Sequence, residues 1–329
     1  MDKLVAAGAP GVIVLFRNGD QVIRLARGFA DVARKMPMRT TDRFRIASLT
    51  KSFTAAIVLQ LVGEGKLSLD DTVETHLPGL VPNGEMITIR HLMNHTSGVF
   101  DFYSDQNFFK QFVRNRTRTW TPQERVAVAT GHKPLFAPGA GWSYSNTGYV
   151  LLGLIVEKVT GHSLVQELRG RIFSPLGLRA TSAPTTPQIE GRHARGYVIF
   201  DKPPAEDVTA VTPSVAWAHG DIVSTAADVV AFYRALLGGR LLRADLLRTM
   251  ETTVATPYGK DQKYGLGLMT GRLSCGTVWG HDGDFAGYQT TTWNSRDGRR
   301  QVVIMVNSSS LSQTAKKQVN RLIESAYCR

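Results

Sequence analysis

The chain has 329 residues, of which 43% are hydrophobic and 20% are charged, and its formal net charge is +12. This length and composition are typical of a globular protein with one large domain or two closely packed lobes. The basic residues are scattered and form no nucleic-acid motif, so we expect no nucleic-acid partner. No apolar stretch approaches the ~18–20 residues that cross a bilayer, so we expect no transmembrane segment.

The N-terminal part of the chain predicts strands followed by a helix. Residues 11–30 form an apolar run, a turn at Asn18-Gly19-Asp20 and a second run, which is the pattern of a β-hairpin. A short strand over 44–47 leads into a helical segment that starts at Ser48 and ends near Gly63.

The rest of the chain divides into a helical middle and a strand-rich end. Its clearest middle helix is predicted from Thr147 through Val159. Beyond residue 210 we predict a helix near 225–237, a final helix at about 312–326 and strands over 264–269, 276–280, 287–293 and 301–306. We therefore expect an α/β (α+β) fold with one lobe from residues 1–65 and 206–329. A mostly helical lobe from residues 66–205 is inserted, and the active-site cleft lies between the two.

A serine and a lysine stand at the predicted start of the first long helix. Ser48 and Lys51 are three residues apart, so their side chains lie on one face, and a desolvated lysine amine can take the serine proton. The helix N-terminus adds N–H groups that stabilise an oxyanion. Taken alone, the pair also fits a serine cap beside a solvated lysine.

Two further motifs follow in order. Tyr144-Ser145-Asn146 offers a phenol as a proton relay and an amide as a substrate ligand, and His281-Asp282-Gly283 offers an imidazole beside a glycine. Gly283 would let the substrate backbone approach a strand edge, and the Asp284 N–H would be the second oxyanion donor beside that of Ser48. Each tripeptide alone is a common loop or turn sequence, and only their combination indicates an acyl-transferring serine enzyme.

Cysteine and histidine carry weaker signals. Cys275 and Cys328 fit two isolated thiols as well as a disulfide between the last helix and the sheet. His91 and His95 have a zinc-binding spacing, but no glutamate lies between them in the metalloprotease pattern, so we interpret both as structural. We expect no metal and no cofactor.

The three motifs together resemble those of the penicillin-recognising serine enzymes, which include class C β-lactamases and esterases. The chain is most similar to the secreted D-alanyl-D-alanine carboxypeptidases of that superfamily. The resemblance runs nearly end to end and is specific at five further segments: Phe44 to Ser48, Gly65 to Asp71, His95 to Gly98, Pro138-Gly139 and Tyr264 to Leu268.

The resemblance implies a role for each site residue. Ser48 would be acylated, Lys51 would be the base or its partner, Tyr144 the proton shuttle and Asn146 the substrate amide ligand. His281 would stand where β-lactamases have a lysine and relay a proton with Tyr144.

The resemblance also carries expectations about the rest of the protein. Trp217 would flank the substrate cleft, and a Cys275–Cys328 disulfide would be formed in an extracellular protein. The sequence itself begins at Met1-Asp2-Lys3 without a signal-peptide pattern. We expect a monomer that acts on small peptide or D-amino-acid substrates and is inhibited by β-lactams.

The substrate site departs from the carboxypeptidase pattern. Asp282 and Asp284 occupy positions where those enzymes have hydroxyl residues that bind a C-terminal carboxylate, and Met269 stands where they have an arginine. Like charges in a cleft repel by about 1–4 kcal/mol, so carboxypeptidase activity is expected to be weakened. Arg272 is an alternative cation whose direction the sequence leaves open.

Two functions therefore remain beside D-alanyl-D-alanine carboxypeptidase. One is a D-aminopeptidase, D-stereospecific amidase, esterase or thioesterase with the same acyl-serine chemistry. The other is a non-catalytic penicillin-binding sensor, which is disfavoured because the serine, lysine and tyrosine are all intact.

Overall fold

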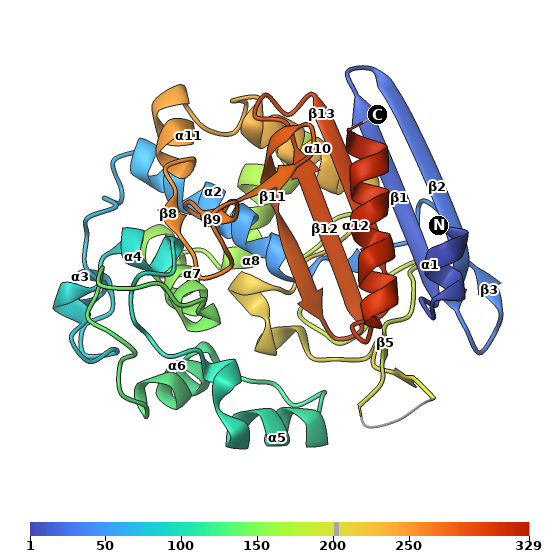
Figure 1. Ribbon diagram of the computed structural model, residues 1–329. Helices are drawn as coiled ribbons and strands as arrows, with labels where there is room; N and C mark the ends of the chain where they lie inside the picture. The colour runs from blue at the N-terminus through green and yellow to red at the C-terminus, as the bar shows by residue number, and fades with distance from the viewer. Residues whose placement is uncertain (201–203, 329) are drawn as a thin grey trace.

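The computed structural model describes residues 1–200 and 204–328. Its centre is one antiparallel sheet of nine strands built from both ends of the chain (Figure 1). In spatial order the strands are β3 (Met36–Pro37), β2 (Gln21–Asp31), β1 (Gly11–Asn18), β13 (Arg300–Val306), β12 (Tyr288–Asn294), β11 (Gly276–Phe285), β10 (Met269–Leu273), β9 (Lys263–Tyr264) and β8 (Val254–Ala255).

Helices cover both faces of the sheet. On one face α1 (Asp2–Ala6) and α12 (Gln313–Tyr327) close a small core against Val12, Val14 and Ile304. On the other, α2 (Thr50–Gly63) and α10 (Ala226–Leu237) share the main core with Ile13 and Met305. Because successive strand residues point to opposite faces and both faces are covered, β1 and β13 are apolar over most of their length and polar only at one end.

The middle of the chain forms the helical part (Figure 1). At its centre lies α7 (Asn146–Thr160), whose residues 147–153 are all buried. The described residues of this part also form α3 (Val73–His76), α4 (Ile89–Met93), α5 (Gln106–Arg114), α6 (Pro122–Thr130), α8 (Leu164–Leu168) and α9 (Ser174–Leu176). Later in the chain, α11 (Ala244–Met250) packs against α2. Two small ladders pair β4 (Phe44–Arg45) with β7 (Val223–Ser224) and β5 (Tyr197–Val198) with β6 (Glu206–Asp207). The exact lobe boundaries at 65 and 206 stay a prediction.

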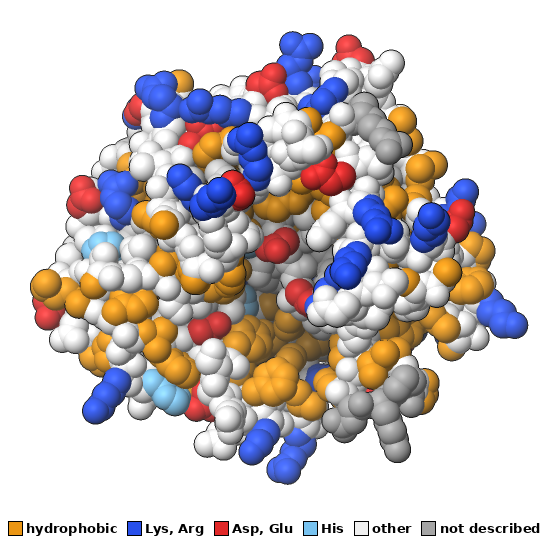
Figure 2. Space-filling model, viewed as in Figure 1, with side chains coloured by type: hydrophobic (Ala, Val, Ile, Leu, Met, Phe, Trp, Pro, Cys, Tyr) orange, Lys and Arg blue, Asp and Glu red, His pale blue; other side chains and the backbone are white. Residues whose placement is uncertain are grey.

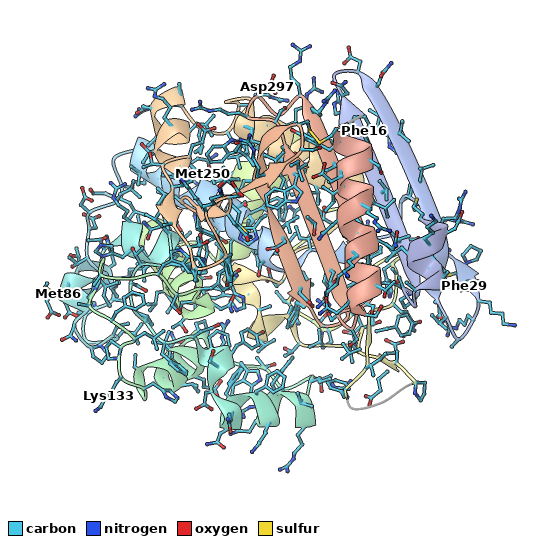
Figure 3. All side chains as sticks on the ribbon, in the orientation of Figure 1. Phe16, Phe29, Met86, Lys133, Met250 and Asp297 are labelled. Atoms are coloured by element: carbon cyan, nitrogen blue, oxygen red, sulfur yellow. A yellow bond between two sulfur atoms is a disulfide. The ribbon has the colours of Figure 1, made fainter. Side chains whose placement is uncertain are left out.

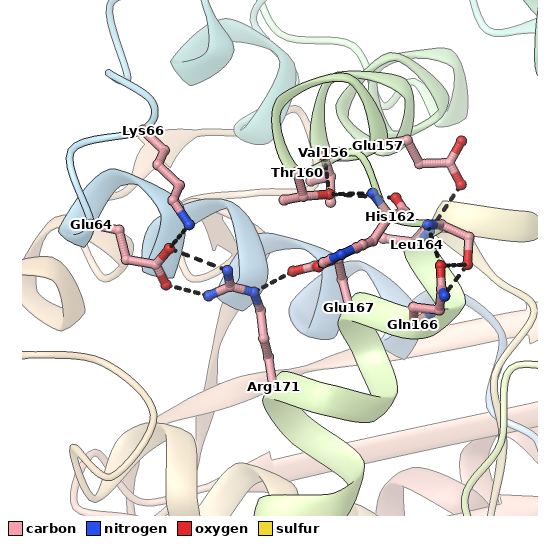
Figure 4. A network of polar contacts seen from close by, with 11 residues as sticks. Glu64, Lys66, Val156, Glu157, Thr160, His162, Leu164, Gln166, Glu167 and Arg171 are labelled. Atoms are coloured by element: carbon pink, nitrogen blue, oxygen red, sulfur yellow. Dashed lines mark hydrogen bonds and ion pairs between the residues drawn. The ribbon is translucent and has the colours of Figure 1, made fainter.

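A charged network ties the end of α2 to the helical lobe (Figure 4). Arg171, in a π-helical turn after α8, contacts both Glu64 and Glu167. Lys66 pairs with Glu64 at 2.9 Å, and His162 lies 2.8 Å from Glu167. The network therefore joins residues about a hundred positions apart in the sequence.

The structure confirms most predicted elements and corrects two. The predicted hairpin, the helix after Ser48 and the helices near 147–159, 225–237 and 312–326 are all present. The predicted strand over 264–269 is wrong, because the Gly265 N–H bonds the Leu268 carbonyl at 2.7 Å and the chain turns there. The strand predicted over 276–280 instead continues to Phe285, so that the His281 motif lies within a strand rather than after it.

Cys275 and Cys328 form a disulfide that joins the start of β11 to the end of α12. Within the described residues, no single helix is long and apolar enough to cross a membrane. The helices Asn146–Thr160 and Leu164–Leu176 reach that length and apolar composition only as a pair, and the pair is bent by 83°. The described residues also contain no group of three side chains able to hold a metal ion. His91 instead belongs to the capping box of α4, and His95 accepts the Ser145 N–H at 3.2 Å.

Candidate active site

Ser48 lies in a 3₁₀ turn, Ala47–Leu49, that leads directly into α2. The residue before it, Ala47, has a φ of +50°, a conformation that costs a non-glycine residue roughly 1–3 kcal/mol. The ladder between β4 and β7 fixes the chain on one side of this turn, and α2 fixes it on the other. Such strain at a candidate nucleophile is typical of functional sites, because the surrounding structure has to hold it.

Lys51 is fully buried, and its ammonium contacts Ser48 as the sequence predicts. Its Nζ donates to Ser48 Oγ at 3.1 Å, to Asn146 Oδ1 at 2.8 Å and to the His219 carbonyl at 3.1 Å. Burial lowers the pKa of Lys51 from its ordinary value to about 7, although Asp101 and Asp282 act in the opposite direction. A substantial fraction of Lys51 is therefore a neutral amine at neutral pH, able to accept the Ser48 proton.

Tyr144 and Asn146 lie on the other side of Lys51. The Lys51 Nζ is 4.7 Å from the centre of the Tyr144 ring. Burial raises the pKa of Tyr144 well above its ordinary value, and a contact with the Ser48 hydroxyl partly opposes that rise. Tyr144 is therefore a neutral phenol near neutral pH. Its O–H is a proton donor next to the nucleophile.

Asp101 is a site residue that belongs to none of the sequence motifs. It accepts from Asn146 twice, from Nδ2 at 3.0 Å and from the backbone N–H at 3.2 Å. Because a carboxylate only accepts, these bonds turn Asn146 Oδ1 toward Lys51. Burial raises the pKa of Asp101, and Lys51 and the Asn146 bonds oppose the rise. Its only sequence signal is its position three residues after the His95 to Gly98 segment.

The expectation that His281 relays a proton with Tyr144 is not met in this geometry. The His281 ring is fully buried, and its Nε2 lies 2.9 Å from the hydroxyl of Tyr264. Its Nδ1 contacts the Asp282 carbonyl, which only accepts, so Nδ1 carries the proton and Nε2 accepts from Tyr264. Burial and the charge of Lys51 lower the pKa of His281 to about 3. His281 is thus a neutral partner of Tyr264 behind the cleft.

Gly283 brings β11 against the nucleophile. A Cβ on Gly283 would lie 2.6 Å from the Ile46 carbonyl oxygen and 2.8 Å from the Ser48 nitrogen. The glycine is therefore required by the approach of the protein's own backbone, rather than by a substrate backbone as the sequence suggested. Any larger residue would push β11 and Ser48 apart.

The backbone of β11 offers an N–H group beside that of Ser48. Ala286 and Gly287 both have positive φ, 50° and 83°, which defines a two-residue type I′ hairpin. Phe285 and Tyr288 then form a hydrogen-bonded pair, and the alternation along the ladder leaves the Asp284 N–H pointing away from β12. Since β11 pairs with β10 only as far as Gly280, that edge is open. The Asp284 N–H is thus available as the predicted second oxyanion donor.

A cleft of about 910 Å³ opens in front of these residues. Figure 2 shows a hollow near the centre of the viewed face, with acidic and hydrophobic side chains in and around it. Its lining includes Ser48, Tyr144 and Asn146 together with Asp282 and Asp284.

Both aspartates face this cleft. The Asp282 side chain is 59% accessible to solvent, and the Asp284 carboxylate accepts from Gln289 at 2.8 Å. The protein around the cleft raises the pKa of both groups by displacing water, and the charge of Asp284 raises that of Asp282 further.

Met269, Arg272 and Trp217 occupy three different surroundings. Met269 lines the cleft, whereas Arg272 lines a separate hollow together with Lys260 and Asp261, so it does not replace the missing arginine. Trp217 does not line the cleft. Its ring packs against Gly153 of α7 and lies 5.5 Å from the Arg125 guanidinium, which corrects the expectation that it flanks the substrate.

This site is that of a serine hydrolase, and comparisons with known proteins identify the family. A family model described as Beta-lactamase matches residues 1–325. The chain is 29% identical over 309 residues to Penicillin-binding protein 4* of Bacillus subtilis (strain 168), which covers 90% of this chain and 68% of that protein. It is 28% identical over 324 residues to the D-aminopeptidase of Brucella anthropi, with 95% and 59% covered.

Solved structures agree over nearly the whole chain. A D-stereospecific amidohydrolase from Streptomyces sp. has a TM-score of 0.90 and 39% identity, covering 98% of this chain and 95% of that one. The D-amino acid amidase from Ochrobactrum anthropi SV3, in complex with L-phenylalanine amide, has a TM-score of 0.88 and 33% identity, covering 99% and 94%.

The chain belongs to the β-lactamase family and is a serine hydrolase, as its motifs predicted. It spans only 59–68% of the length of the two curated relatives described above.

Proposed function

We propose that this protein hydrolyses amides of D-amino acids and short D-amino-acid-containing peptides, through an acyl-Ser48 intermediate. The observation that carries the proposal is the pair of carboxylates, Asp282 and Asp284, that line the cleft on either side of Gly283. Two acids repel a substrate carboxylate and attract a substrate ammonium group. Free amino-acid amides and peptides with a free amino group carry that ammonium and need carry no carboxylate near the cleaved bond.

The reaction follows from the contacts around Ser48. Neutral Lys51 takes the Oγ proton across 3.1 Å while Oγ attacks the substrate carbonyl carbon. The N–H groups of Ser48 and Asp284 receive the developing oxyanion. The departing nitrogen gains the proton that Lys51 took from Ser48, with the Tyr144 hydroxyl as the relay, and leaves as ammonia or an amine. Water then attacks acyl-Ser48 by the same route and releases the acid.

The comparisons support this substrate class better than D-alanyl-D-alanine carboxypeptidase activity. The neighbours with TM-scores of 0.90 and 0.88 are a D-stereospecific amidohydrolase and a D-amino acid amidase, and a curated relative is a D-aminopeptidase. A penicillin-binding protein is also among the relatives, so β-lactams are expected to acylate Ser48 as well.

The first test uses a matched pair of substrates. An N-acylated D-alanyl-D-alanine peptide is supplied with a free C-terminal carboxylate and as its amide, and hydrolysis is followed by chromatography. We expect faster hydrolysis of the amide, and Ser48→Ala must abolish it. Faster hydrolysis of the free acid would refute the proposed role of the two aspartates and make the enzyme a carboxypeptidase.

A second test isolates the ammonium group and the stereochemistry. D-Alanine amide is compared with its N-acetyl derivative and with L-alanine amide. We expect the free D-amine to be preferred over both, and the preference over the N-acetyl compound to fall in Asp282→Asn with Asp284→Asn. Conversely, the triple change Asp282→Thr, Asp284→Thr and Met269→Arg should raise carboxypeptidase activity. Equal rates for the free and acetylated amines would contradict the proposed recognition of the amino group.

A further inference from the structure

The cleft is larger than the catalytic residues and a single amino-acid amide require. Its 910 Å³ lies near the upper end of the roughly 300–1,000 Å³ that enclose a drug-sized ligand. Part of its lining is apolar and comes from α5 and from residues in or next to β5 and β6. We call this part of the cleft the α5 arm, and define it by Phe109, Phe112, Val113, Val198, Phe200 and Val208.

The α5 arm is apolar, and its mouth is lined by accessible aromatic rings. Phe109 is 49% exposed and Phe200 is 41% exposed, although large apolar side chains are usually covered. Figure 2 shows hydrophobic side chains gathered below the hollow, on the side where Figure 1 places α5. Deeper in the arm, Phe112 stacks on Phe285 of β11 with ring centres 6.3 Å apart. Phe285 and the two aspartates line the same cleft, so the arm and the carboxylate pair belong to one cavity.

One charged pair borders the arm. Arg116 donates to Glu206 at 3.0 Å, and its guanidinium lies 5.0 Å from the centre of the Phe200 ring. These contacts join the end of α5 to β6 and keep Phe200 beside the arm. The arm therefore offers an arriving group apolar area rather than an ion-pair partner.

We propose that the α5 arm is a subsite for an apolar residue of an extended substrate, one or more positions from the cleaved bond. This proposal rests on the proposed function, because it assumes a D-amino-acid-containing substrate at Ser48. It assigns the preferred substrate as a short D-peptide that carries a hydrophobic residue beyond the D-residue, rather than a single-residue amide. Burying a phenyl or leucyl side chain against the arm would favour such a peptide over one with a polar residue at that position.

The test compares two peptides of equal length that start with free D-alanine. One carries leucine or phenylalanine two positions on, the other carries serine there, and both end as amides. We expect wild type to prefer the apolar peptide roughly tenfold in kcat/KM, mainly through KM. The variants Phe109→Ala and Phe200→Ala should each reduce that preference about threefold to fivefold.

Phe29→Ala is the matched control, because Phe29 is 40% exposed and lies on β2 (Figure 3). In the strand order of the sheet, β1, β13 and β12 separate β2 from β11, which borders the cleft. The Phe29→Ala variant should leave the preference unchanged. The ratio of D-phenylalanine amide to D-alanine amide is measured in the same variants. If that ratio collapses while the peptide preference persists, the arm holds the acyl residue's own side chain and the proposal is overturned.

A binding experiment tests the subsite proposal independently of the proposed function. The Ser48→Ala variant is titrated calorimetrically with both peptides, so that binding is measured without turnover. Tighter binding of the apolar peptide, weakened by Phe109→Ala, supports the arm even if wild type hydrolyses neither peptide. Equal affinities for the two peptides overturn the arm, whatever the enzyme proves to hydrolyse.

Discussion

Replacing Gly283 with alanine tests the link between β11 and the nucleophile. The new Cβ would lie 2.6 Å from the Ile46 carbonyl oxygen, 2.8 Å from the Ser48 nitrogen and 2.9 Å from the Ala47 Cβ, whereas ordinary contacts begin at 3.4 Å. Relieving these contacts requires β11 and the turn at Ser48 to separate by about 0.5–0.8 Å. The separation moves the Asp284 N–H away from that of Ser48, although neither group is chemically altered.

The expected loss is large because an oxyanion donor acts only at short range. Losing one such donor costs roughly 10²–10³ in kcat, and a misplacement near 1 Å costs about 10². We therefore expect Gly283→Ala to lower kcat for amide hydrolysis about 100-fold. Overpacking should also cost about 1–3 kcal/mol of unfolding free energy.

The assay must separate the loss of kcat from the loss of stability. Hydrolysis of D-alanine amide is measured at a temperature well below the unfolding midpoint, which is determined by circular dichroism for each variant. Gly170→Ala is the control, because its Cβ would meet nothing within 4 Å. A folded Gly283→Ala protein with kcat within threefold of wild type would refute the proposed oxyanion site.

Three further outcomes follow from the charged groups. Because the pKa of Lys51 is lowered to about 7 and its neutral form is the base, kcat/KM for an uncharged ester should rise as pH increases through about 7 and level off above about 8; a flat profile between pH 5.5 and 8.5 would contradict this role. Asp101→Asn removes a charge that raises the pKa of Lys51, so the midpoint of the same profile should move to lower pH, and an unchanged or higher midpoint would argue against the coupling. Contacts with Arg171 lower the pKa of Glu64 to about 2, so this carboxylate stabilises the fold above its unfolded pKa of about 4.5 and loses that contribution as pH falls toward 2. Because Glu64 is partly exposed, Arg171→Met should cost only about 1 kcal/mol at pH 7 and less at pH 3, which denaturant unfolding at the two pH values will measure.

Local sequence patterns were sufficient for the long elements. The alternation and turn residues of 11–30 predicted the hairpin, and helical spacing predicted α7 and α12, because these elements satisfy their backbone hydrogen bonds within a short stretch. The Ser48–Lys51 pair was predictable for the same reason, since three residues along a helix bring two side chains to one face.

Contacts between distant segments were not predictable in that way. Asp101 reaches the site only because the loop after α4 packs on the start of α7, and no local pattern marks it as a partner of Asn146. The family resemblance implied that His281 relays a proton with Tyr144. Its direction is set by the hydroxyl of Tyr264, which comes from a different strand.

The sequence by itself therefore determined which reactive groups are present: a serine, a lysine that can act as its base, a tyrosine phenol and two acids beside a glycine. The tertiary structure decided which of these groups touch. Burial set the pKa of Lys51, because desolvation depends on every segment that packs around the amine. The tertiary structure also places the Trp217 ring against Gly153 rather than in the cleft, and it forms the α5 arm. The shape of a cavity follows from the packing of helices and strands that are far apart in the chain.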